Sequence, residues 1–154
     1  MTASARPLPA DLPTGLFLDG RWRPAASGAT FDVLDPATGE LLAKVADASP
    51  AEGLAALDAA HDAFAGWSAT APRRRSDILR RAFDLVMRDA DRIARLITLE
   101  MGKPLKESRA EVVYGAEFLR WFSEEAVRIA GRYGPSPEGT GTMTISAMRW
   151  DRPC

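Results

Sequence analysis

Few side chains in this sequence could take part in chemistry, and they lie far apart. His61 is the only histidine and Cys154 the only cysteine. A nucleophilic thiol needs a base beside it, and a metal site needs several Cys, His or carboxylate ligands. His61 falls at helical spacing between Leu57 and Phe64, so we expect it to pack against a neighbouring element rather than to act as a base or ligand. Cys154 has no histidine near it in the sequence and is interpreted as a spare thiol.

Three further patterns could bind a ligand, but each has a simpler structural interpretation. The three arginines at 73–75 could bind phosphate, yet they follow Pro72 at an expected helix start and indicate a solvated helix face. The Gly-Thr-Gly sequence at 139–141 lacks the flanking strand, the helix and the third glycine of a phosphate loop. Trp121 and Phe122 lie on an expected helix, where aromatic residues usually pack in a core or an interface. The residues alone therefore assign no catalytic or cofactor-binding side chain and leave any metal ligand unknown.

Composition excludes several classes of function. The 154 residues carry 20 basic and 21 acidic side chains, so the net charge of −1 does not favour nucleic acid or an anionic membrane as a partner. No apolar run is long enough to cross a bilayer. A single cysteine cannot form an internal disulfide, and we expect a cytoplasmic protein.

The N-terminal third of the sequence is typical of short strands. Residues 1–15 form a Pro- and Ala-rich stretch that we expect to be a flexible lead-in. Residues 16–48 alternate apolar and polar side chains around turns at 19–20 (Asp-Gly) and 35–39. The pattern predicts a small antiparallel β arm.

Four amphipathic helices are expected over residues 49–131. Ser49 and Glu52 have the spacing of a capping box, in which each side chain accepts a hydrogen bond from the other residue's backbone N–H. Pro72 separates the first helix from the second, and Gly102 ends the third. We expect the fourth helix to run to Gly131.

The C-terminal part is expected to hold a loop and a single strand, over residues 132–146. The loop is rich in Gly and Pro, and Met143 and Ile145 then alternate with polar residues as in a half-buried strand. This terminal strand has no evident partner in the chain, and an unpaired strand leaves backbone groups without hydrogen bonds.

A more specific pattern lies in residues 98–131, which read TLEMGKPLKESRAEVVYGAEFLRWFSEEAVRIAG. This segment resembles the N-terminal region of the NAD(P)-dependent aldehyde dehydrogenases, most closely the succinate-semialdehyde dehydrogenase branch. The match is carried by Glu100-Met101-Gly102-Lys103-Pro104, Glu107, Glu111 and the WFSEEA sequence at 121–126. LFLDGRW and FDVLDPATGELLAKVADAS lie upstream in the family's order, so the resemblance covers about residues 16–146.

The resemblance implies an α/β fold of the aldehyde dehydrogenase type, of which this chain would be only the N-terminal piece. It assigns residues 49–131 to the helical part of the coenzyme-binding domain. It assigns the β arm and the first strand within 132–146 to the oligomerisation region, and family members are homo-oligomers. Some relatives also hold a structural monovalent cation, for which the carbonyls of Val33 and Leu34 and the carboxylate of Glu111 match by position. A surface carboxylate on a helix is the simpler interpretation of Glu111.

The resemblance implies the family's chemistry, in which a cysteine thiolate attacks an aldehyde and a hydride passes to NAD or NADP. The resulting thioester is then hydrolysed to the acid, with a glutamate as the base. None of these working residues matches a position in this chain, and Cys154 lacks the family's catalytic cysteine motif. The expectation is therefore a chain that neither binds the cofactor nor acts on an aldehyde by itself.

Residues 147–154 depart from the family, which continues here with a sequence close to VGP. Trp150 has the single codon TGG and the Asp151 codon begins with GA, so reading one base earlier gives GGA, a glycine codon. We therefore expect residues 147–154 to be an out-of-frame tail.

Two other interpretations remain open at this point. The chain could be a stand-alone helical interaction module, or a decoy subunit that binds a full-length relative. It could instead be a poorly folding remnant, because amphipathic helices without a sheet to cover expose apolar faces and favour aggregation.

Overall fold

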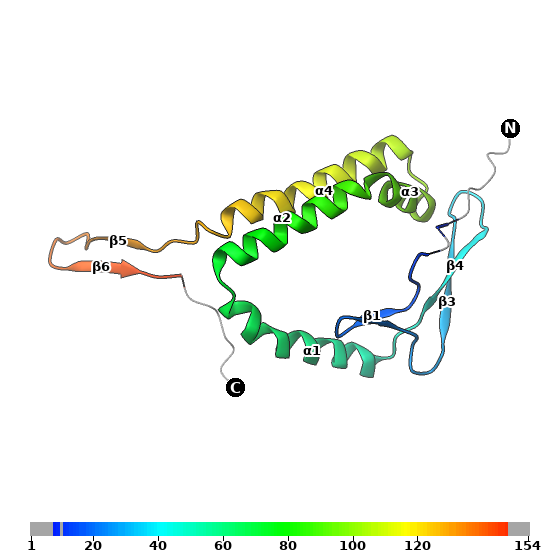
Figure 1. Cartoon of the computed structure of the whole chain (residues 1–154), viewed down its shortest axis with the longest axis horizontal. Helices are drawn as coiled ribbons and strands as arrows, with labels where there is room; N and C mark the ends of the chain where they lie inside the picture. The colour runs from blue at the N-terminus through cyan, green and yellow to red at the C-terminus, as the bar shows by residue number, and fades with distance from the viewer. Residues whose placement is uncertain (1–7, 10, 148–154) are drawn as a thin grey trace.

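The computed structural model describes residues 8, 9 and 11–147. The elements in chain order are β1 (Leu16–Leu18), β2 (Arg21–Arg23), β3 (Thr30–Leu34), β4 (Leu41–Ala46), α1 (Pro50–Ala69), α2 (Pro72–Arg88), α3 (Ala90–Met101), α4 (Leu105–Glu125), β5 (Arg132–Pro135) and β6 (Thr142–Ile145). Helices α2 and α4 lie side by side, α1 and the strands β1–β4 complete an open, ring-like outline, and β5–β6 projects from the end of α4 (Figure 1). The predicted order of a β arm followed by four helices is confirmed.

The β arm consists of two separate antiparallel hairpins, β1–β2 and β3–β4. In the first, Asp19 and Gly20 both have positive φ angles, 50° and 74°, as a two-residue hairpin turn requires. In the second, the pairing shifts between Val33 and Leu34, and the turn is closed by the backbone of Asp35, whose N–H donates to the carbonyl oxygen of Glu40 at 2.9 Å. Both predicted turns are therefore present.

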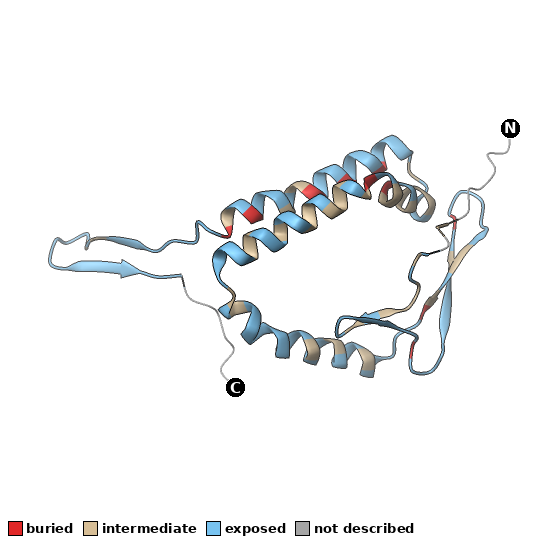
Figure 2. Cartoon of the chain, viewed as in Figure 1, coloured by how far each residue is buried: buried red, intermediate tan, exposed pale blue. Residues whose placement is uncertain are grey.

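Helix α1 begins at the predicted capping box. The Ser49 hydroxyl accepts the backbone N–H of Glu52, and the Glu52 carboxylate accepts that of Ser49. The helix has no buried residue along its length (Figure 2). His61 is exposed, so the prediction that it packs against a neighbouring element was wrong, because helical spacing shows which side chains share a face and not whether another element covers that face.

The core lies where α2, α3 and α4 meet. Its centre consists of Ala90 and Ala94 of α3 and Val112 of α4, with Val86 of α2 packed against them. Small side chains at these positions let the helix axes approach closely. Between α3 and α4, the hydroxyls of Thr98 and the fully buried Ser108 form a hydrogen bond of 2.9 Å.

Gly102 forms the elbow between α3 and α4, as predicted. Its φ angle is 74°, in the left-handed region that glycine tolerates best, and its N–H donates to the carbonyl of Thr98. A Cβ atom at this position would lie 3.2 Å from Cγ of Pro36, so the elbow also contacts the β3–β4 turn.

Helix α4 ends at Glu125, six residues before the predicted end at Gly131. The N–H of Arg128 donates to the carbonyl of Glu125 at 2.8 Å, which is an i to i+3 bond that tightens the chain after the last helical turn. Val127 and Ile129 are β-branched, and such side chains lose rotamer freedom in a helix. The glycine at 131 marked the start of the next strand rather than the end of the helix.

The prediction of an unpaired terminal strand was wrong. β6 pairs with β5 in an antiparallel hairpin, with Arg132 opposite Ile145 and Pro135 opposite Thr142. Gly and Pro are depleted in strands, so the sequence of β5 indicated a loop. The hairpin accommodates Pro135 because that residue is the last of its strand.

The molecule exposes far more surface than a compact domain of its size. Its accessible area is 12,077 Å² for a mass of 16.7 kDa. A compact monomer of this mass exposes about 7,600 Å². The expectation that the helices would leave apolar faces exposed is confirmed, since large hydrophobic residues of α1 and α4 are among the exposed residues.

Candidate functional site

The most distinctive surface of the described chain is a row of aromatic side chains on α4. Tyr114, Phe118, Trp121 and Phe122 follow one another at helical spacing and are 49% to 68% exposed. They line a shallow groove together with Glu117. The rings of Tyr114 and Phe118 meet edge to face, with centroids 5.2 Å apart. We call these four aromatic residues the aromatic face.

The other side of α4 explains why the aromatic face points outward. The buried residues of the helix are Ser108, Val112, Ala116 and Ser123, which lie on the side packed against α2 and α3. Tyr114 and Phe118 are each two residues from Ala116 and therefore lie about 200° around the helix from it. Trp121 and Phe122 do not pack in the core of the described chain, and their packing in an interface stays a prediction.

A contiguous apolar surface of this kind indicates contact with other protein. The aromatic face places four large rings side by side, whereas single exposed apolar side chains are common on any protein surface. Helix α1 carries a second exposed set, Leu54, Leu57, Phe64 and Trp67. The aromatic face was not predicted as a unit, although the helical spacing of Tyr114, Phe118 and Trp121 in the sequence is a signal for it.

The two phosphate-like motifs lie at the start of α2 and in the β5–β6 loop. Arg73 and Arg74 are exposed in the first turn of α2, as expected of a solvated helix face, whereas Arg75 is half-buried. The backbone N–H groups of Thr140 and Gly141 both donate to the hydroxyl of Ser136, at 3.2 and 3.3 Å, within the β5–β6 loop. The N–H groups of the 139–141 motif therefore contribute to the turn itself. Cys154 lies outside the residues that the structure describes.

Glu111 already has a cationic partner within the chain. Its carboxylate forms an ion pair with the ammonium group of Lys103 and is about half exposed, which agrees with the simpler interpretation of a surface carboxylate. Within residues 8, 9 and 11–147, no group of three or more His, Cys, Asp or Glu side chains is arranged to hold a metal ion. A cation site formed by Val33, Leu34 and Glu111 stays a prediction. Among the helices of the same residues, none combines the length and apolar character needed to cross a membrane.

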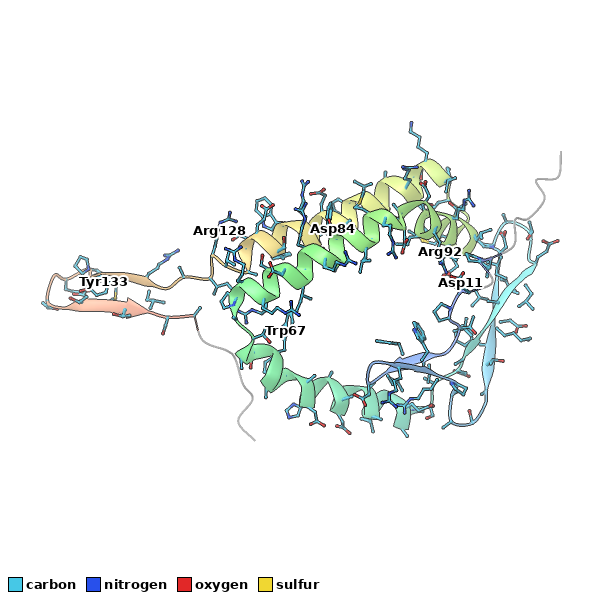
Figure 3. The ribbon with its side chains drawn as sticks, in the orientation of Figure 1. Asp11, Trp67, Asp84, Arg92, Arg128 and Tyr133 are labelled. Atoms are coloured by element: carbon cyan, nitrogen blue, oxygen red, sulfur yellow. The ribbon has the colours of Figure 1, made fainter. Side chains whose placement is uncertain are left out.

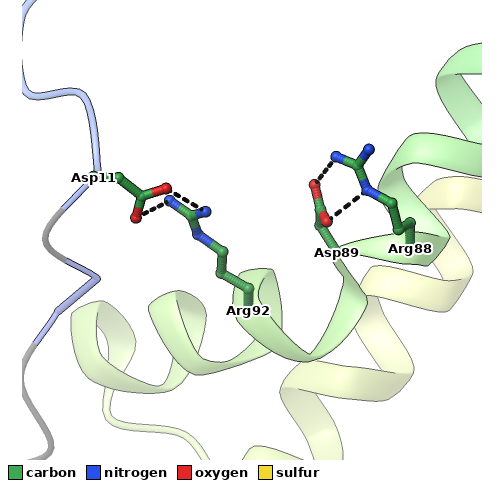
Figure 4. Close-up of polar contacts among 4 residues, drawn as sticks. All are labelled: Asp11, Arg88, Asp89 and Arg92. Atoms are coloured by element: carbon green, nitrogen blue, oxygen red, sulfur yellow. Dashed lines mark hydrogen bonds and ion pairs between the residues drawn. The ribbon is translucent and has the colours of Figure 1, made fainter.

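Two arginine–aspartate pairs lie at the start of α3 (Figure 4). Arg88 donates from Nε and Nη2 to the two carboxylate oxygens of Asp89, at 2.9 and 2.8 Å, and these hydrogen bonds lower the pKa of Asp89. Arg92 forms a second two-point contact with Asp11, at 2.9 and 3.0 Å, which joins the N-terminal segment to α3 (Figure 3). No sequence pattern indicated this contact, because its partners are 81 residues apart.

The arrangement of β arm, α2–α4 and projecting hairpin matches a known family. A family model described as "Aldehyde dehydrogenase family" matches residues 22–148, most of the chain. The chain belongs to the aldehyde dehydrogenase family.

Among the curated aldehyde dehydrogenases it resembles are succinate-semialdehyde dehydrogenases. It is 56% identical over 105 residues to that of Paenarthrobacter nicotinovorans, covering 68% of this chain and 23% of the relative. It is 48% identical over 128 residues to the mitochondrial succinate-semialdehyde dehydrogenase of Rattus norvegicus, covering 80% and 24%. The chain thus spans about a quarter of the length of these relatives.

Solved aldehyde dehydrogenases have the same local fold. The structure of an aldehyde dehydrogenase from Brucella melitensis biovar abortus 2308 superimposes with a TM-score of 0.82 at 41% identity, covering 94% of this chain and 29% of that one. Succinate-semialdehyde dehydrogenase from Burkholderia pseudomallei gives a TM-score of 0.74 at 47% identity, covering 78% and 25%. The predicted resemblance to the family and its succinate-semialdehyde branch is confirmed.

Proposed function

We propose that this chain is the N-terminal part of a succinate-semialdehyde dehydrogenase that oxidises succinate semialdehyde to succinate. The observation that carries the proposal is the 56% identity over 105 residues to an enzyme of that name. The cofactor in this proposal is NAD or NADP, which accepts the hydride from the aldehyde. In support, one solved relative, PnpE, was crystallised with nicotinamide adenine dinucleotide.

In this proposal the catalytic and coenzyme-binding residues belong to the remaining three quarters of the enzyme, and the described chain has a structural role. The aromatic face and the exposed side of α1 contact that remainder, where the helices contribute to the coenzyme-binding domain. The β arm and β5–β6 contribute to the oligomerisation region of a homo-oligomer. The single cysteine is compatible with a reducing compartment, and we propose the cytoplasm as the location.

A reconstitution experiment tests the proposal. The 154-residue chain is produced alone and together with the part of the Paenarthrobacter nicotinovorans enzyme that follows its matched region, and NAD(P)H formation is measured with succinate semialdehyde. We expect no turnover from either part alone and measurable turnover from the pair. Turnover by the 154-residue chain alone would contradict the assignment of the catalytic residues to the remainder.

The same assay tests the substrate. The chain is also 45% identical over 115 residues to a glutarate-semialdehyde dehydrogenase of Pseudomonas aeruginosa, whose named substrate is one methylene longer. Glutarate semialdehyde is therefore the control aldehyde, assayed with an enzyme that carries this chain in place of its own N-terminal part. A consistent preference for the longer aldehyde, whichever relative supplies the remainder, would contradict the succinate-semialdehyde assignment.

A further inference from the structure

The carboxylate of Glu52 accepts hydrogen bonds from two parts of the chain. Its Oε2 atom accepts the backbone N–H and the hydroxyl of Ser49, both at 2.9 Å, which belongs to the capping box of α1. Its Oε1 atom accepts the backbone N–H of Ala26 at 2.8 Å. Ala26 precedes Glu52 by 26 residues and lies in the loop between β2 and β3. Of these contacts, a capping box needs only the one between the Glu52 carboxylate and the backbone N–H of Ser49.

The loop that carries Ala26 is itself held in a defined conformation. Ala25 is 3% exposed, and its carbonyl accepts the N–H of Gly28 at 2.8 Å in a turn where Gly28 has a φ angle of 72°. One residue beyond that turn, the carbonyl of Ala29 accepts the N–H of Asp47 at 2.9 Å. The N–H of Ala26 is therefore presented to Glu52 by an ordered loop.

Helix α1 packs less closely on the rest of the described chain than α2, α3 and α4 pack on one another. None of its residues is buried, so side-chain packing of the kind that joins α2, α3 and α4 does not orient it. The backbone between the end of β4 and the start of α1 is only residues 47–49. A contact at the first turn of α1 therefore has a large effect on where the rest of the helix lies.

We infer that Glu52 is a positioning residue that fastens the β2–β3 loop to the first turn of α1 and so sets the direction in which α1 leaves the β arm. The residue suits this role because an ionised carboxylate accepts several hydrogen bonds at once and binds N–H donors more strongly than a neutral acceptor does. The hydrogen bonds from Ser49 and Ala26, with the nearby charge of Arg23, also lower the pKa of Glu52. The carboxylate is therefore ionised at neutral pH.

Amide hydrogen exchange of the 154-residue chain, followed residue by residue, tests this inference. The variant Glu52→Gln keeps the size of the side chain, but its amide nitrogen cannot accept a hydrogen bond. We expect the exchange of the Ala26 N–H to become at least about threefold faster, because its hydrogen bond is weakened. We also expect a broader distribution of distances between spin labels placed on the β2–β3 loop and in the middle of α1.

Two control variants show whether the effect on Ala26 exchange comes from its hydrogen bond to Glu52. Glu107→Gln changes the third residue of α4, the same helical position as Glu52 in α1, where the helix has no side-chain cap. Ser49→Ala removes the capping hydroxyl and leaves the contact between Glu52 and Ala26. We expect Ala26 exchange to stay at the wild-type rate in both variants, while Ser49→Ala loosens the first turn of α1.

Three results would overturn the inference. The first is an unchanged Ala26 exchange rate in Glu52→Gln. The second is equal acceleration in Glu52→Gln and Ser49→Ala, because the effect would then come from the capping box alone. The third is loss of overall helix content in Glu52→Gln when Ser49→Ala keeps it, because a positioning residue leaves the elements themselves intact.

Discussion

Ser108 shows how one polar side chain can be accommodated in a small helical core. It is fully buried, and its hydroxyl is bonded to that of Thr98 on the neighbouring helix. The same hydroxyl also donates to the carbonyl of Pro104 at 3.4 Å, so these two contacts replace the hydrogen bonds to water that it loses on burial. The pair therefore links α3 to α4 at a position where the sequence alone shows only a serine in a helix.

We expect Ser108→Ala to lower the free energy of unfolding by about 1–2 kcal/mol, because it leaves the Thr98 hydroxyl without its partner. Ser123→Ala is the control. Ser123 is also buried, but its hydroxyl donates only to the carbonyl of Arg120 in its own helix, at 2.6 Å. Urea unfolding followed by circular dichroism measures both. Equal losses of unfolding free energy in the two variants would show that the hydrogen bond between α3 and α4 stabilises the fold no more than a bond within one helix.

Asp89 confers a pH dependence at the junction of α2 and α3. The hydrogen bonds from Arg88 lower the pKa of its carboxyl in the folded chain below the ordinary value of 3.8. A lowered folded-state pKa stabilises the fold above the unfolded-state pKa, and this stabilisation is lost as the pH falls through the folded-state value. We expect Asp89→Asn to be less stable than wild type at pH 7, with a difference that shrinks toward pH 3.

Urea midpoints measured across that pH range test the prediction for Asp89. Asp77→Asn, at an exposed position of α2, is the matched control. A stability difference between wild type and Asp89→Asn that grows as the solution becomes more acidic would contradict the expected direction of the effect.

At the scale of elements, local signals in the sequence predicted local structure well. The capping box at Ser49, the Asp-Gly turn and the Gly102 elbow each depend on a few adjacent residues, and all three are present. The end of α4 was mispredicted because Gly131 precedes the strand β5 and does not end the helix. β5 was mispredicted because glycine and proline, such as Pro135, usually indicate a loop. Contacts over long sequence distances, such as that of Arg92 with Asp11, have no local signal at all.

The close packing of α4 on its neighbours depends on small side chains. Ala116 is 1% exposed and faces α2 and α3. We expect Ala116→Leu to destabilise the fold by about 1–3 kcal/mol, because the added methylene groups would force the helices apart. Ala110→Leu, at an exposed position of the same helix, is the control and should have little effect. Thermal unfolding compares the two, and a stabilised Ala116→Leu chain would show that space remains at this contact.

Substitutions in the aromatic face are expected to leave the fold intact, unlike Ala116→Leu, because the side chains of the aromatic face point outward. We expect the double variant Phe118→Ser and Trp121→Ser to keep its helix content and to bind less of a hydrophobic fluorescent dye. Tyr133→Ser, at an 81% exposed position of β5 outside the aromatic face, is the control and should leave dye binding unchanged. Collapse of the helix content in the double variant would show that the two rings support the fold itself.

At the scale of the whole molecule, the family could be predicted from the sequence, whereas the open arrangement could not. The EMGKP sequence at 100–104 and the residues around it identify the family because many positions match the family's sequence pattern at the same spacing. The exposed area follows instead from where the elements lie relative to one another, which depends on contacts that leave no periodic pattern. The candidate site was only half predicted: exposed apolar helix faces were expected, but the grouping of Trp121 and Phe122 with Tyr114 and Phe118 on one face of α4 was not.

The out-of-frame origin of residues 147–154 stays a prediction, because all but the first of these residues lie outside the described part of the chain. We expect DNA re-sequenced from the codon of Ile145 onward to read, after a shift of one base, a sequence close to VGP followed by TPWNFP. The family match runs to residue 148, two residues into the expected tail. A downstream sequence without such a continuation in the shifted frame would contradict the out-of-frame interpretation.

The pairing of strands also affects how the chain folds while it is being synthesised. In the described part of the chain, each strand pairs with a neighbour in sequence, α3 packs on the next helix, α4, and α2 packs on α4 with only α3 between them in the sequence. Contacts of this kind require the closure of short loops only, so they form quickly. On a ribosome, these hairpins and helices can therefore assemble as they emerge. The aromatic face would then be exposed on the nascent polypeptide, at the stage of synthesis when chaperones bind apolar surfaces.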